Sequence, residues 1–178
     1  MNRLNRWRFA GIITIIILGF GLHYLFSWTD GSKIIGLFVP VNESVWEHLK
    51  LGYWSVVLFS VIEYVPIKHS VTNYYFAKTI GVLALEVTII IIFYGYTFIA
   101  GKDILLIDIF SYILGVIACQ YVTYIFLRLK PFSIFLNRIS LVLFISTGVL
   151  FGGITYYPPH TALFKDHNTN TYGITKEK

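Results

Sequence analysis

Residues 79–100 read TIGVLALEVTIIIIFYGYTFIA and carry a single charged side chain, Glu86, in a run of 22 residues. About 20 predominantly apolar residues are enough for a helix to cross the hydrocarbon core of a bilayer. A helix also gives every backbone N–H and C=O group an internal partner, which a lipid environment requires. The stretch therefore predicts a membrane-spanning helix.

The composition extends this prediction to the whole chain. Of 178 residues, 56% are hydrophobic and 13% are charged, and the mean hydropathy of +0.70 is outside the range of soluble domains. We expect an all-α fold, a polytopic transmembrane helical bundle that forms one integral membrane domain over residues 1–178, with a polar C-terminal tail at 158–178. The apolar segments long enough to span lie at about 8–28, 45–67, 79–100, 106–128 and 137–157.

The basic residues predict the orientation of this bundle. All five arginines fall on one side of the membrane if the N-terminus is inside; they are Arg3, Arg6, Arg8, Arg128 and Arg138. Basic residues gather on the cytoplasmic side, so we expect the N-terminus in and the C-terminus out, in a multi-pass protein of the cell membrane that contacts membrane lipids. The net charge of +5 is spread over short loops, which predicts no nucleic-acid partner.

The sequence NESVWEHLK, residues 42–50, places several polar side chains at the predicted outer start of the second span. Ser44 and Glu47 match the capping box, in which a hydroxyl and a carboxylate each accept a hydrogen bond from an unpaired amide of the first helical turn. Capping explains these two residues without any chemistry. It leaves His48 unexplained, because this imidazole lies about one turn inside the helix, at the level of the lipid head groups.

Other ionisable side chains fall on the same predicted side as His48. They are His23, Glu43, Glu47, Asp103, Asp108, His160, Asp166 and His167. Imidazole and carboxylate groups together suit zinc or another divalent metal, or general acid–base catalysis. Their spacing matches no strong metal motif such as His-Glu-x-x-His.

From this grouping we predict the outer-face site of a membrane-embedded hydrolase or transferase that acts on a lipid or lipid-linked substrate. The predicted catalytic residues are Glu47, His48 and His160, and the predicted ligands of a divalent metal are His48 and His160. The predicted substrate-binding residues are Asn42, Glu43 and Asp166. Helix capping combined with hydrogen-bonded interfacial groups is the alternative interpretation of the same residues, and both stay open.

The segment YYPPHTALF, residues 156–164, follows the fifth span. Pro158 and Pro159 should end the helix, because proline has no backbone N–H to continue it. Residues 162–164 are apolar enough to fold back onto the outer surface, and that path would carry His160 over the start of the second span. The remaining residues, 165–178, are polar and predict a tail or a lid.

Three polar side chains fall within the predicted spans: Glu63, Glu86 and Gln120. A carboxyl group inside a bilayer is costly and therefore marks a functional candidate. Glu63 lies near the cytoplasmic end, where pairing with Lys68 is the simpler explanation. Glu86 lies deeper, and we expect it to hydrogen-bond to Gln120 or to relay protons. These residues support an alternative function as a small transporter or ion-coupled carrier.

Small residues suggest how the predicted helices pack. Gly148 and Gly152 on the fifth span permit close helix approach, and a third interpretation is a non-catalytic membrane assembly or interaction protein that docks there, which allows a homo-oligomer. On the fourth span, small and partly polar residues recur at helical spacing on one face, which should point into the bundle. They are Asp108, Ser111, Tyr112, Gly115 and Cys119.

The sequence PVNESVWEHLK, residues 40–50, together with PPH at 158–160 and TYG at 171–173, resembles an uncharacterised family of small multi-pass bacterial membrane proteins, a domain of unknown function. The resemblance extends over essentially the whole chain. It implies a compact helical bundle in a bacterial cytoplasmic membrane and assigns no activity to any residue.

Overall fold

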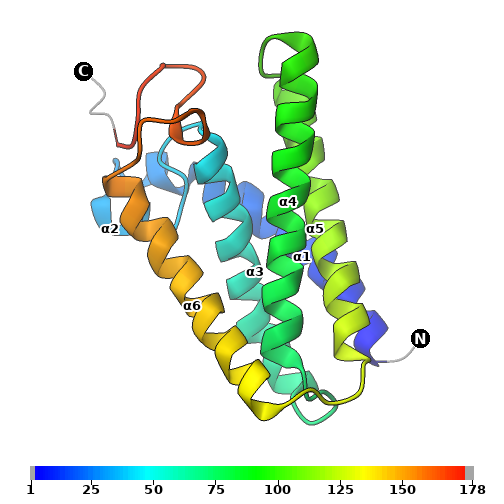
Figure 1. The fold of residues 1–178 in the computed structure, drawn as a ribbon. Coiled ribbons are helices and arrows are strands. Elements are labelled where there is room, and N and C mark those ends of the chain that lie inside the picture. The colour runs from blue at the N-terminus through cyan, green and yellow to red at the C-terminus, as the bar shows by residue number, and fades with distance from the viewer. Residues whose placement is uncertain (1–2, 175–178) are drawn as a thin grey trace.

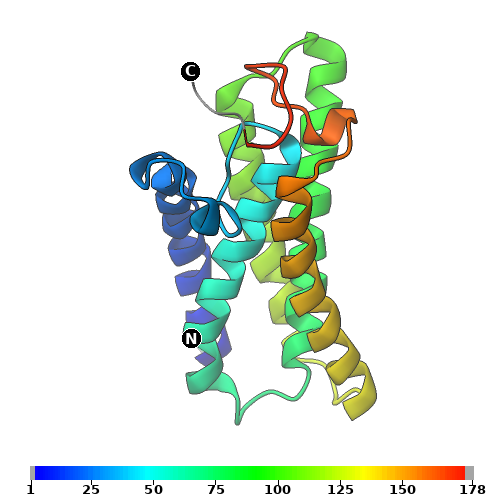
Figure 2. The same cartoon turned by 90° about the vertical axis from the view of Figure 1, so that its left-hand side faces the viewer.

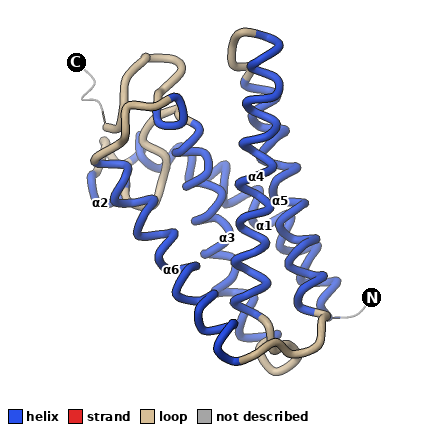
Figure 3. Tube along the Cα trace, viewed as in Figure 1, coloured by secondary structure: helices blue, strands red, loops and turns tan. Residues whose placement is uncertain are grey.

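Helices dominate the part of the chain that the structure describes. The computed structural model describes residues 3–174 (Figure 1), and its long elements there are all helices (Figure 3). Five of them are long and apolar enough to cross a membrane, which confirms the predicted architecture. The helices are α1 (Arg3–Trp28), α2 (Lys33–Gly36), α3 (Val45–Ile67), α4 (Tyr74–Ala100), α5 (Leu105–Leu127), α6 (Ile134–Tyr156) and the 3₁₀ helix η1 (Ala162–Phe164).

The spans end close to the predicted positions, but α1, α4 and α6 begin earlier on the predicted cytoplasmic side. Hydropathy locates the apolar centre of a helix, whereas backbone hydrogen bonding continues through polar residues until a cap stops it. At the start of α6 that cap is Ser133, whose Oγ accepts a hydrogen bond from Leu136 N at 3.1 Å. The extra turns therefore lie outside the apolar runs that hydropathy detects.

Helix α3 lies at the centre of the bundle. It packs against α1, α4 and α6, while α4 forms an extensive hairpin with α5, and α1 packs against both α3 and α5. We call the end that holds the start of α3 the outer end, after the predicted orientation. The α4–α5 hairpin extends beyond the outer end of α3 (Figure 1).

One face of α1 lies very close to its neighbours. Gly11, Ile15 and Gly19 recur every four residues on this face and are buried. Tyr112 of α5 lies over Gly19, and its hydroxyl donates a hydrogen bond to Ile15 O at 2.9 Å. A Cβ atom at Gly19 would overlap the Tyr112 side chain, so only glycine lets α1 and α5 approach this closely.

The small residues of α6 pack against other parts of the same chain. Gly148 packs on Tyr53 of α3, and Gly152 packs on Leu37 in the segment after α2. Both glycines are buried. The pair therefore joins α6 to its own chain, and a second copy would have to dock elsewhere.

A buried ion pair connects α3 with α2 and α6. Lys50 Nζ lies 2.5 Å from Glu47 Oε2, and both side chains are inaccessible to solvent. The ammonium also donates hydrogen bonds of 2.8 Å to Gly36 O and Thr155 Oγ1. Thr155 Oγ1 lies 2.8 Å from Glu47 Oε1, and Val41 N donates to Glu47 Oε2 at 3.2 Å. Both charges therefore have the several partners that burial requires.

The capping box is confirmed for one of its two hydrogen bonds. Ser44 Oγ accepts from Glu47 N at 3.4 Å. The Glu47 carboxylate does not return this bond to Ser44 N, which donates instead to Asn42 Oδ1 at 2.9 Å. A carboxylate forms a stronger hydrogen bond with a charged ammonium than with a neutral amide. The Glu47 carboxylate therefore pairs with Lys50 and not with Ser44 N.

Lys50→Ala should destabilise the protein by about 3–5 kcal/mol, because it leaves the Glu47 carboxylate buried without its counter-charge. Thermal unfolding in detergent measures the change. Lys68→Ala, at an exposed lysine after α3, is the control and should cost less than about 0.5 kcal/mol. Adding Glu47→Gln to Lys50→Ala should recover part of the loss; a loss no larger than that of the control would contradict the pairing.

Gly19→Ala should destabilise the protein by about 1–3 kcal/mol, because the added methyl group overlaps Tyr112 and pushes α1 away from α5. The same unfolding measurement applies. Gly21→Ala is the matched control, since a Cβ atom at Gly21 meets nothing within 4 Å. Equal stability of the two variants would show that α1 does not depend on this close approach.

Candidate functional site

An open cavity of about 420 Å³ lies at the outer end of the bundle. Its walls come from α1, the segment before α3, α3 itself, α4, α5 and the C-terminal segment. Tyr112 is among the lining residues, so the cavity begins where the contact between α1 and α5 ends. The ionisable side chains on its walls, tyrosines aside, are His23, Glu43, His48, Asp103, Asp108 and His167.

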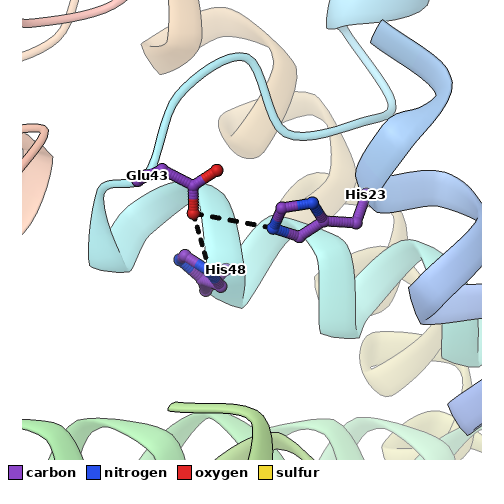
Figure 4. Close-up of side chains that lie close together, drawn as sticks. All are labelled: His23, Glu43 and His48. Carbon is purple, nitrogen blue, oxygen red and sulfur yellow. Dashed lines mark ion pairs between the residues drawn. The ribbon is translucent and has the colours of Figure 1, made fainter. Parts of the chain in front are cut away.

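Three of these side chains converge on one point of the wall (Figure 4). The Nε2 atoms of His48 and His23 lie 3.5 Å and 3.6 Å from the same oxygen, Glu43 Oε2. One donor atom from each residue lies within 4.8 Å of the other two. The three residues come from α1, the segment before α3 and the first turn of α3, so only the folded chain brings them together.

The close-packed face of α1 leads directly to His23. Gly11, Ile15, Gly19 and His23 follow one another at intervals of four residues, so each lies beside the one before it in a row that turns slowly around the helix. Tyr112 covers this face at Gly19. His23 lies one turn farther out, beyond that contact, and its imidazole therefore lines the cavity.

The segment that carries Glu43 is held by the C-terminal segment. Glu43 N donates a hydrogen bond to Asp166 Oδ2 at 3.3 Å, and Asn42 Nδ2 donates to Gly173 O at 2.9 Å. The C-terminal segment lies over the outer end of α3 (Figure 2). These contacts tie residues 42 and 43 to the C-terminal segment.

A hydrogen bond to the backbone selects the tautomer of His48. Its Nδ1 lies 2.9 Å from Ser44 O, and a carbonyl oxygen can only accept, so Nδ1 carries the hydrogen. Nε2 is then either protonated and paired with Glu43, or it presents a lone pair toward a carboxylate. The second arrangement is repulsive unless a cation lies between the two groups.

Two of the three separations between donor atoms in this cluster are close to those in a metal site. Ligand atoms of a tetrahedral zinc site lie about 3.3–3.4 Å apart when each bond is about 2.0–2.1 Å long. The observed 3.5 Å and 3.6 Å are close to this spacing and longer than ordinary N–H···O hydrogen bonds of about 2.7–3.2 Å. Two imidazoles and one carboxylate would leave the fourth zinc position open to the cavity.

The electrostatics of the cluster favour the charged form of Glu43. The interaction with the His23 imidazole is the largest cause that lowers the pKa of Glu43, and the charges of His48 and His23 add to it. Partial burial opposes them and raises the pKa, but the net direction is downward. Glu43 is therefore a carboxylate at neutral pH, as an ion pair or a metal ligand requires.

The structure does not bring the three predicted catalytic residues together. Glu47 faces Lys50, because neighbouring residues on a helix point about 100° apart and Glu47 cannot share the direction of His48. His160 is exposed and stacks on Tyr172, with ring centroids 4.5 Å apart. It does not line the cavity, so His48 finds its partners in His23 and Glu43 instead.

The predicted fold-back of the C-terminal segment is confirmed, but it delivers a different histidine. Phe164 is buried against Trp46 of α3, with ring centroids 4.8 Å apart. After the two prolines, the chain returns to the bundle only at Phe164. His160 precedes this point and stays outside the cavity. His167 therefore reaches the cavity, where its ring lies 5.0 Å from that of Phe93.

Of the predicted substrate-binding residues, only Glu43 lines the cavity. Asp166 is buried and orders the C-terminal segment, since its Oδ1 accepts hydrogen bonds from Asn168 N at 2.7 Å and Thr169 N at 3.0 Å. Asn42 joins that segment to the start of α3. In the structure, both residues position the Glu43 segment.

The intramembrane polar residues have other neighbours than expected. Glu63 forms a buried ion pair with Lys78 of α4, and the predicted pairing with exposed Lys68 is wrong. The expected hydrogen bond between Glu86 and Gln120 is also not formed: within residues 3–174, Glu86 Oε1 and Gln120 Nε2 are buried without hydrogen-bond partners. Gln120 packs instead against Gly11 of α1.

Comparison with known proteins places the chain in a family. Residues 1–174 match DUF6512, a family of unknown function. The chain belongs to this family. The DUF6512 match includes every wall of the cavity and the C-terminal segment, and it confirms the resemblance to a domain of unknown function. No curated protein and no solved structure matches the chain.

Glu43→Gln should weaken the pH dependence of the free energy of unfolding in the acidic range. A carboxyl whose pKa is lowered by folding stabilises the protein above its unfolded value, here 4.5, and this contribution disappears as the pH falls through the folded pKa. At about pH 6 the wild type should therefore unfold at a higher temperature than the variant. This difference should disappear as the pH falls through the lowered pKa of Glu43. Because the Glu43 side chain is 39% exposed, the effect should stay below about 1 kcal/mol.

Asp30→Asn, at an exposed carboxyl in the turn after α1, serves as the control for Glu43→Gln in the same unfolding experiments. Its unfolding temperature should change with pH as that of the wild type does. If the unfolding temperature of Glu43→Gln also changes with pH as that of the wild type does, charge interactions in the His23–Glu43–His48 cluster do not contribute to stability.

Proposed function

We propose that this DUF6512 chain is a metal-dependent hydrolase embedded in the cell membrane, with its site in the outer cavity. One observation carries the proposal: the Nε2 atoms of His23 and His48 approach one oxygen of Glu43 on the wall of an open cavity. Catalytic zinc sites use three such nitrogen and oxygen ligands and keep one position for water or substrate. Polar networks that only stabilise a fold have no need of an open cavity.

The donor set and its support favour zinc. Imidazole nitrogen with one carboxylate is a ligand combination that suits zinc. The hydrogen bond from His48 Nδ1 to Ser44 O is the outer contact that orients a metal-binding histidine and leaves Nε2 free to coordinate. The C-terminal segment positions the backbone of Glu43, whose amide donates a hydrogen bond to Asp166 Oδ2.

Asp108 of α5 is the proposed proton acceptor. It lines the same cavity, and Tyr96 donates a hydrogen bond of 2.7 Å to its Oδ1, which orients the carboxylate and leaves Oδ2 for a proton. A bound zinc ion lowers the pKa of its water to about 7, so that a carboxylate nearby can take a proton from that water.

In the proposed reaction, the oxygen of the water forms a bond to the acyl carbon or phosphorus of an ester, and the bond to the leaving oxygen breaks. Asp108 takes the proton from the water and returns it to the leaving oxygen. A transferase reaction differs only in using an alcohol in place of water. The reaction needs no oxidant or second cofactor.

The purified protein in lipid nanodiscs should bind about one zinc ion per chain, as measured by equilibrium dialysis with elemental analysis. His23→Ala and His48→Ala should each weaken zinc binding by more than the about 10–100-fold that loss of an outer contact costs. His160→Ala is the matched control and should bind zinc as the wild type does. Equal zinc binding by all four proteins, or none by any, would overturn the metal site.

The hydrolytic step is tested on p-nitrophenyl carboxylic and phosphoric esters with the zinc-loaded protein. Asp108→Asn keeps the shape of the side chain and its contact with Tyr96, and should lower kcat by about 10²–10⁴-fold while zinc content stays unchanged. Turnover that is independent of zinc, or equal in wild type and Asp108→Asn, would contradict the proposed chemistry.

A further inference from the structure

The outer cavity is covered on the side where α3 and α4 meet. The C-terminal segment packs on α3 through Phe164 and Trp46 and on α4 through His167 and Phe93. Asn168 completes this part of the wall. The segment therefore bridges the outer ends of the two helices.

The opposite side, between α1 and α5, has no such bridge among the cavity-lining residues. The two helices meet at Gly19 and Tyr112, and farther out α1 crosses away from α5 toward α2 (Figure 1). Beyond the contact, α1 presents His23 and Tyr24 to the cavity, and α5 presents Leu105 and Asp108. We call this opening the lateral portal. Tyr24 is 55% exposed and Leu105 68% exposed, so its edges are accessible from outside.

The portal lies near the outer end of the first candidate span. At 1.5 Å per residue, the 26 residues of α1 extend about 39 Å, which exceeds the hydrocarbon core of about 30 Å. His23 is five residues from the outer end of this helix, or about 7–8 Å along it. The cluster therefore lies in the outer part of the candidate span, on the side nearest the ester groups of outer-leaflet lipids.

The lining of the cavity matches an amphiphile in this position. The ionisable groups gather around Glu43 and Asp108, whereas Val45, Ile89 and Phe93 supply apolar surface. On α1 and α5, large apolar side chains outside the cavity are exposed where lipid chains would contact them. A lipid could place its polar part inside while its chains stay in the bilayer.

We propose that the cavity receives the ester group of a glycerophospholipid, which enters sideways through the lateral portal while its acyl chains remain in the outer leaflet. This inference rests on the proposed function and names the substrate class of the same site. It makes Leu105 and Tyr24 the residues that control entry. A water-soluble ester would need no such opening in the membrane-facing surface.

Photo-crosslinking tests the inference on the whole protein in nanodiscs. The probe is a phosphatidylcholine with a diazirine near the ester end of one acyl chain, and mass spectrometry locates the labelled residues. We expect labelling at residues 21–28 and 105–109 several-fold above that at Val149 and Leu150, two exposed apolar residues in the outer half of α6. Unlabelled phosphatidylcholine added in excess should reduce portal labelling but not labelling of α6.

Leu105→Trp should narrow the portal and reduce its labelling several-fold, with zinc content unchanged. Leu106→Trp is the matched control, because this neighbouring residue is equally apolar and exposed but does not line the cavity. Portal labelling no higher than on α6, or equal in the two tryptophan variants, overturns lateral entry even where zinc binds. Saturable portal labelling in a protein that binds no zinc overturns the metal chemistry instead and supports lipid binding.

Discussion

The buried ion pair between Glu47 and Lys50 is the interaction on which the outer end of the protein depends. Charges persist in an interior only when they are fully partnered, and these two find partners in α2, α6 and the segment before α3. Those hydrogen bonds fix the path of residues 37–44. Glu43 lies on that path, so a pair that takes no part in the proposed chemistry determines where the carboxylate meets two histidines.

The five spans could be predicted because a bilayer accepts few alternatives. A segment without internal hydrogen bonds cannot remain in hydrocarbon, so apolar runs such as residues 79–100 had to become helices. The helix ends were less accessible to prediction, since α4 continues through Tyr74 and Lys78 before the apolar run begins. Both of those residues are buried by tertiary contacts, including the ion pair of Lys78 with Glu63, which hydropathy does not register.

The candidate site was predicted as an outer-face group of histidines and carboxylates, but its members depend on helix rotation and on the path of two loops. Of the two neighbouring residues predicted for the site, His48 lines the cavity, whereas Glu47 points into the protein. His23 was noted on the correct side and assigned no role. The signal that could have found it is the interval of four from Gly11 through Gly19, because a close-packed face continues to the next residue on it.

The dependence of the Glu43 segment on the end of the described chain has a consequence for biosynthesis. His23 and His48 leave the ribosome early, whereas Asp166 and Gly173, which hold the neighbouring backbone, follow only after all five long helices. A nascent chain with every helix inserted could form the Glu47–Lys50 pair but would still lack the hydrogen bonds that tie residues 42 and 43 to the C-terminal segment. In the predicted orientation, the contacts of residues 42 and 43 with the C-terminal segment therefore form only after that segment has been translocated.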